Sequence, residues 1–201
     1  MAYDLVIKNG TIVVGSGLPG FHGGVGVSGG KIVEIGRVNG EAKRVVNADG
    51  LTVAPGIIDN HTHYDAQVTW DPLCTYSCYH GVTSVVIGNC SLAMAPAHKE
   101  DRDNLAGVLS HVEAIPLEAI QAGVKWSWET IPQYLDALDQ RLGLNVASLI
   151  GHSAVRRYVM GDASQERHAT DEEISSMKAI VREGIKAGAV GVSFERNPRH
   201  F

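Results

Sequence analysis

The sequence predicts an α/β protein in which a small β-module comes before a parallel sheet with helical crossovers. Three observations predict this class. Residues 3–52 hold short strand patterns separated by turn residues, with no helical pattern among them. Residues 53–201 alternate apolar strand patterns with amphipathic helical segments. The 201 residues also include 23 glycines, as many tight turns between strands and helices require.

Residues 1–52 are expected to form a small β-sandwich portion with antiparallel strands. The dipeptide Asn9-Gly10 separates two apolar strand patterns, which is typical of a β-hairpin turn. Gly29-Gly30 separates two further strand patterns in the same way. Several strands without a helix to cover them indicate a sandwich-like layer. The expected strands are residues 4–8, 11–14, 25–28, 31–36 and 44–48.

Residues 53–201 are expected to form a parallel sheet. Near-continuous apolar strands joined by helices are typical of such a sheet, which is either covered on both faces or closed into a barrel. The last helix has the clearest ends, because Thr170 and Glu173 form a capping box and Gly188 follows its last turn. Four strand–helix units are half of what a (β/α)₈ barrel needs. The expected strands are residues 52–59, 84–88, 145–150 and 189–194, and the expected helices are residues 98–112, 130–142 and 171–187.

Charge and composition disfavour several functional classes. The formal net charge is −5 and the basic residues are scattered, which argues against a nucleic-acid-binding surface. The N-terminus lacks the basic and apolar regions of a secretory signal, and no apolar run reaches the roughly 18 residues that a membrane span needs. Three cysteines are too few for a disulfide framework, so a reducing, cytoplasmic setting is expected.

Two histidines and a cysteine that follow strands predict a metal site. His61 and His63 come after the first apolar strand of the α/β region, and extended residues two apart point to the same side. Cys90 ends the second strand, where its thiolate would be a soft ligand, and a small buried apolar side chain is the alternative. Imidazole and thiolate are common zinc ligands, and the carboxyl ends of barrel strands are where such sites lie.

Four further residues are candidates for the site because of their position. His152 follows the third strand and is expected at the substrate pocket, with a packing role as the alternative. Tyr64 and Asp65 follow the two histidines and either face the substrate or cap the next helix. Glu195 follows the fourth strand, where it is either a carboxylate ligand or a solvated turn residue paired with Arg196.

Several segments resemble the amidohydrolase superfamily. Residues 54–63, APGIIDNHTH, resemble its first barrel strand. Residues 81–90, GVTSVVIGNC, resemble the second strand of its N-acyl-D-amino-acid deacylase (D-aminoacylase) group, whose metal site includes a cysteine on that strand. Residues 128–138 and 151–156 are similar to the same group, so the resemblance covers nearly the whole chain.

The resemblance implies the N-terminal half of a metal-dependent (β/α)₈ barrel and hydrolysis of an amide or related C–N bond. It implies one or two Zn²⁺ ions, with His61, His63 and Cys90 among the ligands. Histidine ligands from strands five and six and a catalytic aspartate from strand eight would lie beyond residue 201. No general base is therefore assigned within this chain.

One segment departs from the pattern of the group. D-aminoacylases often read GFST after strand four, whereas residues 191–198 read GVSFERNP. No lysine ends this strand, so the carbamylated lysine of hydantoinase-like relatives is not expected. The departure leaves the identity of the substrate open.

Three functional classes follow from the sequence. The chain is one subunit of a split hydrolase, completed by a second polypeptide and acting on a small-molecule amide, or it is a fragment of a longer hydrolase. The alternative is a non-catalytic binding or scaffold protein built on half of the fold. Within the hydrolases, a hydantoinase- or dihydroorotase-like enzyme for cyclic amides is the alternative to an N-acyl-amino-acid deacylase.

Overall fold

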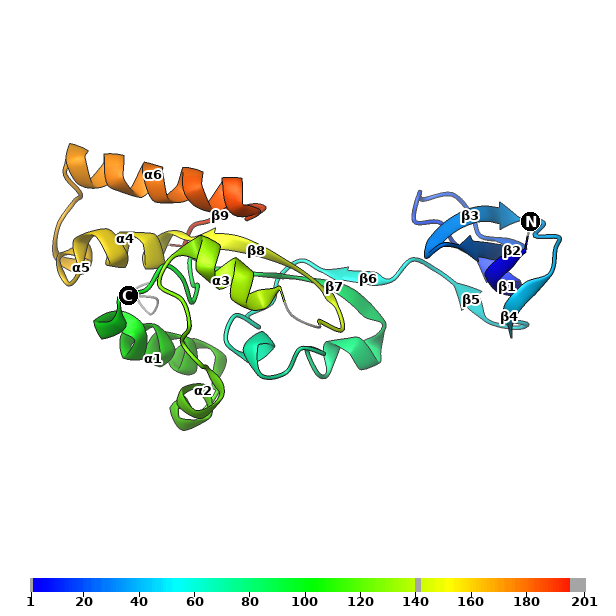
Figure 1. Cartoon of the computed structure of the whole chain (residues 1–201), viewed down its shortest axis with the longest axis horizontal. Coiled ribbons are helices and arrows are strands. Elements are labelled where there is room, and N and C mark those ends of the chain that lie inside the picture. Colours follow the sequence, from blue (N-terminus) through cyan, green and yellow to red (C-terminus); the bar gives the residue numbers. More distant parts are fainter. Residues whose placement is uncertain (1, 140–141, 196–201) are drawn as a thin grey trace. The chain divides into compact units, whose positions relative to one another are not determined.

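The computed structural model describes residues 2–139 and 142–195. The chain divides into two compact units, Met1–Gly56 and Ile57–Phe201 (Figure 1). Among the described residues, no helix combines the length and apolar character that crossing a membrane requires.

The N-terminal unit is a five-stranded sheet. Its strands follow the order β3-β2-β1-β4, and β5 also pairs with β1. Both β4 and β5 run parallel to β1, so the expectation of a wholly antiparallel module is wrong. The parallel pairs arise because the chain crosses from β3 to the opposite edge of β1. The strands are β1 (Tyr3–Ile12), β2 (Phe21–Ser28), β3 (Lys31–Gly36), β4 (Ala42–Asn47) and β5 (Thr52–Val53).

The two predicted turns of this unit have different outcomes. Gly29 and Gly30, both with positive φ, join β2 to β3 as predicted. Asn9-Gly10 does not turn the chain but forms a bulge within the continuous strand β1. Asn9 has a φ of 64° there, and its side-chain amide donates a 2.8 Å hydrogen bond to Asn47 Oδ1 on β4. Pairing with β4 and β5 thus keeps β1 extended through a dipeptide that favours a hairpin.

The C-terminal unit contains a curled parallel sheet, as predicted for half of a (β/α)₈ barrel. The strand order is β6-β7-β8-β9, and every pair is parallel. The expected strand 52–59 is divided, because residues 52–53 join the N-terminal sheet as β5. Ile57 and Ile58 are more than half exposed, since β6 is an edge strand of the described sheet. The strands are β6 (Ile57–Asp59), β7 (Val82–Ile87), β8 (Asn145–Gly151) and β9 (Gly191–Ser193).

The helices follow the local signals to different degrees. α6 has the predicted bounds, with the Thr170–Glu173 capping box formed and Gly188 at a φ of 118°. The expected helix 98–112 is formed by η3 and α1 together, over residues 99–113. The expected helix 130–142 is α3, which ends at residue 138, and residues 140–141 lie outside the described part of the chain. The helices α2 and α4 were not predicted. The helices are η1 (Gln67–Thr69), η2 (Ser77–His80), η3 (Lys99–Asp101), α1 (Arg102–Glu113), α2 (Leu117–Gly123), α3 (Ile131–Leu138), α4 (His152–Met160), α5 (Ala163–Glu166) and α6 (Asp171–Ala187).

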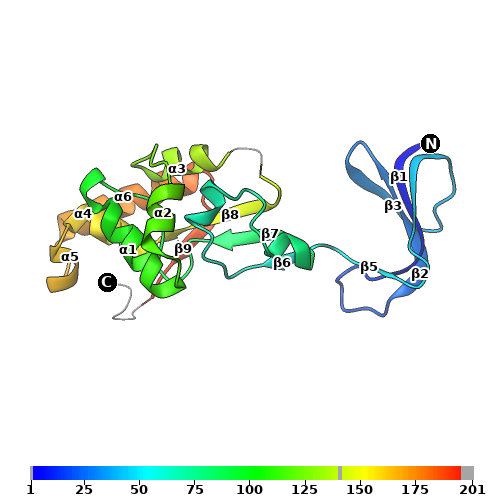
Figure 2. The ribbon, with the colours of Figure 1, turned by 90° about the horizontal axis from the view of Figure 1, so that it is seen from below.

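The core of the C-terminal unit lies between the sheet and these helices. Ile87 on β7, Ile150 on β8 and Tyr134 on α3 are almost completely buried. α6 packs against α3 and α4, and α1 packs against α2 (Figures 1 and 2). The packed strands end at one edge, so the residues that follow β6 and β7 come together there.

Candidate metal centre

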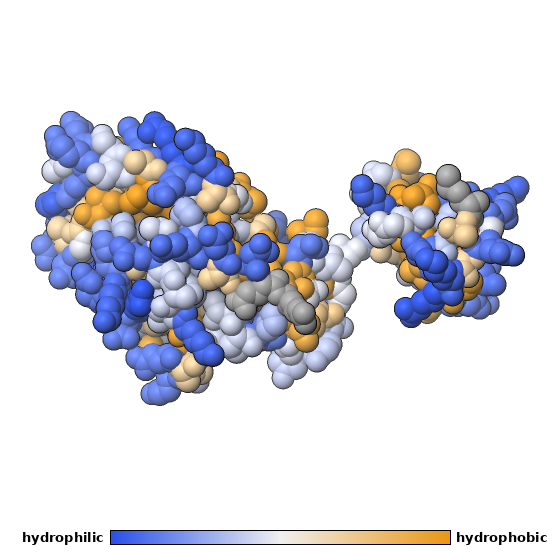
Figure 3. Space-filling model, viewed as in Figure 1, coloured by the Kyte–Doolittle hydropathy of each residue, from blue (hydrophilic) through white to orange (hydrophobic). Residues whose placement is uncertain are grey.

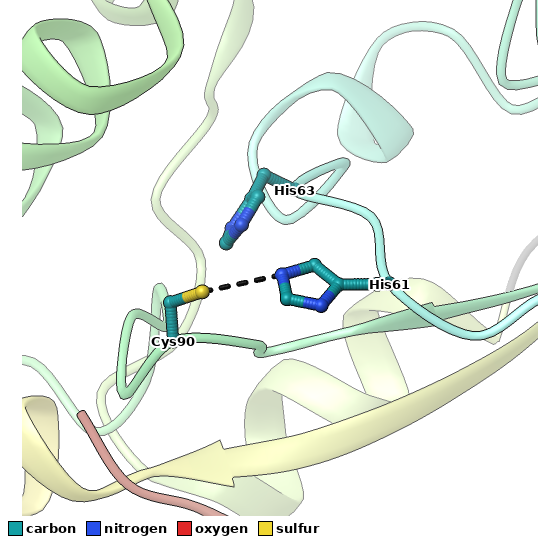
Figure 4. A group of neighbouring side chains, drawn as sticks. All are labelled: His61, His63 and Cys90. Atoms are coloured by element: carbon teal, nitrogen blue, oxygen red, sulfur yellow. Dashed lines mark hydrogen bonds between the residues drawn. The ribbon is translucent and has the colours of Figure 1, made fainter.

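Three predicted metal ligands meet at the carboxyl ends of β6 and β7 (Figure 4). His61 Nε2 lies 3.2 Å from Cys90 Sγ, and the rings of His61 and His63 are 5.4 Å apart between centroids. One potential ligand atom from each of the three side chains lies within 4.8 Å of the other two. The structure thus brings together residues that are up to 29 positions apart in the sequence.

Backbone hydrogen bonds fix the segment between the two histidines against β7. Thr62 donates to the Val86 carbonyl oxygen through both its N–H, at 3.1 Å, and its hydroxyl, at 2.8 Å. The side-chain amide of Asn89 donates to the carbonyl oxygens of Thr62, at 3.2 Å, and Val86, at 2.9 Å. His61 and His63 therefore flank a residue that is tied to the neighbouring strand, which orients both imidazoles toward Cys90.

The turn after β7 holds Cys90 in an unusual backbone conformation. Gly88, Cys90 and Ser91 have φ angles of 78°, 53° and 66°. For non-glycine residues this region is strained, and such strain is typical of functional sites. Ser91 compensates with hydrogen bonds, accepting from the Ser153 N–H at 2.8 Å and donating its own N–H to Ser193 Oγ at 3.0 Å. These contacts join the ends of β7, β8 and β9.

The donor set fits a zinc-like ion. Two imidazoles and a thiol are the ligand types that such an ion prefers, and ligand atoms around a tetrahedral ion lie about 3.3–3.8 Å apart. Burial, followed by the charges of Glu195 and Glu113, raises the pKa of Cys90. A divalent cation would reverse this effect and hold the thiolate form. The negative charge around Cys90 therefore favours a cation at this position.

An open pocket of about 380 Å³ surrounds the two histidines. Tyr64 is one of its lining residues, and the Tyr64 hydroxyl lies 2.8 Å from Ser77 Oγ. Glu113, at the end of α1, also lines it and places Oε1 3.6 Å from His63 Nε2. The pocket therefore presents a phenol and a carboxylate beside the candidate metal ligands.

The other predicted residues lie around this pocket in different ways. Glu195 is near enough for its charge to raise the pKa of Cys90, whereas its alternative partner Arg196 lies outside the described residues. His152 begins α4 and lines an apolar groove, with its ring 5.1 Å from that of Phe194. The described lining of the open pocket does not include His152.

Asp65 is buried beneath the site. Its side chain borders an interior cavity of about 40 Å³ rather than the open pocket. Burial raises the pKa of Asp65 to about 7, and the nearby Gly88 N–H offsets this only in part. Within the described residues, neither carboxylate oxygen has a hydrogen-bond partner of normal geometry. Asp65 therefore lies beneath the site and is not among the described residues that line the open pocket.

Sequence analysis did not identify Glu113 as a site residue. It lies in the segment between β7 and β8, 50 positions after His63, and no motif marks it. The serines that join the strand ends were missed for the same reason. Only the folded arrangement of α1 against the strand ends reveals Glu113.

Comparisons with known proteins agree with this arrangement. The sequence profile of the amidohydrolase family matches residues 44–200. The chain belongs to the amidohydrolase family. It is 37% identical over 194 residues to a D-aminoacylase of Alcaligenes xylosoxydans xylosoxydans, and 34% identical over 192 residues to an N-acyl-D-aspartate deacylase of the same organism. The resemblance to the D-aminoacylase group is thereby confirmed.

Solved structures give the same result. One is a D-aminoacylase structure that addresses the functional role of the enzyme's binuclear metal centre. It matches with a TM-score of 0.83 and 32% identity over 98% of this chain. An N-acyl-D-glutamate deacylase of Bordetella bronchiseptica, in complex with zinc and a phosphonate inhibitor, matches with a TM-score of 0.80 and 33% identity over 96% of this chain. The chain spans 36–37% of the length of the two Alcaligenes relatives and 38–40% of these two structures.

Proposed function

We propose that this chain provides the N-terminal metal-binding part of a zinc-dependent hydrolase that cleaves the amide bond of N-acyl-amino acids. The observation that carries the proposal is the convergence of His61, His63 and Cys90 at the ends of parallel strands. Support comes from the D-aminoacylase and N-acyl-D-aspartate deacylase relatives, whose names state this type of reaction.

Within this site, the residues of this chain would bind the metal ion and orient the substrate. His61, His63 and Cys90 would hold one or two Zn²⁺ ions, with Glu195 as a further candidate ligand. When bound, such an ion supplies a water of lowered pKa and polarises a carbonyl group. Tyr64 lines the open pocket, where its hydroxyl can position a substrate. Zinc is supported by the donor types and by the zinc complex of the similar N-acyl-D-glutamate deacylase.

The proposal requires barrel strands from outside residues 1–201. We infer that these strands, in a second polypeptide or a longer chain, carry the histidines of strands five and six and the aspartate that acts as general base. Support comes from the exposed apolar residues near the β9 edge, where Val190 is 60% and Phe194 70% exposed. An apolar surface between α4 and α6, visible in Figure 3, continues this region.

The proposed setting of the enzyme is the cytoplasm. Cys74, Cys78 and Cys90 form no disulfide bond within the described residues. Free thiols persist most readily in a reducing compartment.

The test is an amide-hydrolysis assay on this chain alone and on this chain co-expressed with the C-terminal barrel half of a D-aminoacylase-like protein. We expect residues 1–201 alone to aggregate and to hydrolyse nothing. The co-expressed complex should release amine from N-acyl-amino acids and lose that activity in the His61→Asn/His63→Asn variant. Hydrolysis of hydantoin or dihydroorotate instead would favour the cyclic-amide alternative. A stable, inactive monomer of residues 1–201 would favour a scaffold role.

A further inference from the structure

A serine of β9 holds the turn that carries Cys90. The Ser193 hydroxyl donates a hydrogen bond to the Gly88 carbonyl oxygen and accepts one, at 3.0 Å, from the Ser91 N–H. These two backbone groups lie on either side of Cys90 in the turn that follows β7. Figure 4 shows Cys90 on this turn with its thiol directed toward His61. A single hydroxyl therefore joins the two ends of the turn, with the candidate metal ligand between them.

The turn reaches β9 by passing over the end of β8. In the sheet order β6-β7-β8-β9, β8 separates β7 from β9, and Ser193 is paired with Gly151 of β8. A Cβ atom added at Gly151 would lie 2.5 Å from the Ser91 carbonyl oxygen, so the turn rests directly on the backbone of β8. Gly151 permits this close approach because it has no side chain. The approach brings the Ser91 N–H within reach of the Ser193 hydroxyl.

The backbone conformation of the turn explains why it needs such contacts. Cys90 and Ser91 have φ angles of 53° and 66°, a region that residues with a Cβ atom rarely adopt. Such a conformation persists only where surrounding groups hold it. Ser153 contributes at Ser91, because its N–H donates to the Ser91 hydroxyl at 2.8 Å and to the Ser91 carbonyl oxygen at 3.2 Å. Ser193 differs from Ser153 in bonding to a residue on each side of Cys90.

We propose that Ser193 is a positioning residue for Cys90 and acts through the backbone of residues 88–91. Its hydroxyl keeps the turn in the conformation that places Cys90 Sγ 3.2 Å from His61 Nε2, close to the separation of two donor atoms on one tetrahedral ion. The inference rests on the metal centre of the proposed function and names a residue that controls how well this centre binds its ion. The competing explanation is that Ser193 only ties β9 to the sheet.

Three variants of the full chain, purified with any chain that accompanies it, separate the two explanations. Ser193→Ala removes the hydroxyl, and Ser193→Thr retains it. Ser84→Ala is the matched control. Ser84 is also a partly buried serine on a strand, and its hydroxyl accepts a 3.3 Å hydrogen bond from the Asn145 side chain of the neighbouring strand, away from the metal centre. Thermal unfolding shows whether each variant is folded.

Three measurements are made on each folded protein. They are the absorption spectrum with Co²⁺, the Zn²⁺ affinity by competition with a chromophoric chelator, and the amide hydrogen exchange of the metal-free protein. The exchange measurement does not depend on a bound metal. It therefore tests the contact between Ser193 and the turn separately from the metal centre.

We expect Ser193→Ala to change all three measurements. In the metal-free protein, the Ser91 amide should exchange about tenfold faster or more, because it loses its acceptor. The thiolate-to-cobalt charge-transfer band should change in position or intensity, because the Cys90 sulfur is no longer held in the same geometry. Zn²⁺ affinity should fall about tenfold or more, as is typical when a residue that orients a ligand is lost. Ser193→Thr should restore all three values toward the wild type, and Ser84→Ala should match the wild type.

An unchanged Co²⁺ spectrum and unchanged Zn²⁺ affinity in folded Ser193→Ala would mean that Ser193 only supports the fold. If Ser193→Ala does not fold, exchange in the wild type tests the contact. A Ser91 amide protected as strongly as the amides of β8 supports it, and an unprotected Ser91 amide refutes it. A wild-type protein that binds neither Zn²⁺ nor Co²⁺ would contradict the proposed function itself. Faster exchange at Ser91 in Ser193→Ala would still show that Ser193 holds the turn, which distinguishes the two failures.

Discussion

Gly88 connects β7 to the cysteine of the metal centre, and replacing it with alanine should be severely destabilising. Its φ of 78° is left-handed, which costs a residue with a Cβ atom about 1–2 kcal/mol. The new Cβ would lie 2.2 Å from the Leu149 carbonyl oxygen, a backbone atom of β8 that cannot rotate away. Moving the strands apart adds about 1–3 kcal/mol, as for other overpacked sites. We therefore expect Gly88→Ala to lower the free energy of unfolding by about 2–5 kcal/mol.

Gly107 in α1 provides the matched control for this substitution. It is a helical glycine with no heavy atom within 4 Å of an added Cβ, so Gly107→Ala should stabilise the protein by about 0.5–1 kcal/mol. Both variants are compared with the wild type by urea denaturation of the same preparation. The Co²⁺ spectrum of Gly88→Ala should also change, because Cys90 lies two residues away. A Gly88→Ala variant as stable as the wild type would refute the described β7–β8 packing.

Three further predictions concern the site and its support. The His61→Asn/His63→Asn variant should keep the wild-type circular dichroism spectrum and lose bound metal, whereas retained metal would exclude both as ligands. Tyr134→Phe removes the hydroxyl that donates at 2.8 Å to the buried Asp65 carbonyl oxygen, and denaturation should show a loss of about 1–3 kcal/mol. The pKa of Asp65 rises from 3.8 to about 7 on folding, so the native state binds this proton more tightly. In metal-free protein, the free energy of unfolding should fall by up to about 4 kcal/mol between pH 4 and pH 7. Asp65→Asn should remove this component, and an unchanged pH profile would contradict it.

Local sequence signals predicted elements whose ends are set by neighbouring residues. α6 is the clearest example, because the Thr170–Glu173 capping box and Gly188 are contained within the helix and its flanks. Asn9-Gly10 shows the limit of such signals. The dipeptide favours a hairpin, but the pairing of β1 with β4, more than 30 residues later, keeps the strand extended. Long-range pairing overrides a local turn preference here.

The candidate metal site was predictable to the extent that its residues belong to strand-end motifs. His61, His63 and Cys90 each follow a strand, and parallel strands end at one edge of the sheet. Glu113 follows no strand, and its approach to His63 depends on how α1 packs. For Asp65 the prediction from the motif was misleading. Its place two residues after His63 favours a position in the open pocket, but its side chain is buried in the interior. Side-chain direction after the strand end was not encoded in the motif.

The most direct test of the central claim is the Co²⁺ absorption spectrum of the purified protein and of its Cys90→Ser variant. The account predicts a thiolate-to-cobalt charge-transfer band in the wild type, because Cys90 Sγ lies 3.2 Å from His61 Nε2 and would bind the same ion. Cys90→Ser should lose this band and bind Zn²⁺ at least tenfold more weakly. A wild-type protein without the band, or a Cys90→Ser variant that retains it, would contradict the assignment of the metal centre to these residues.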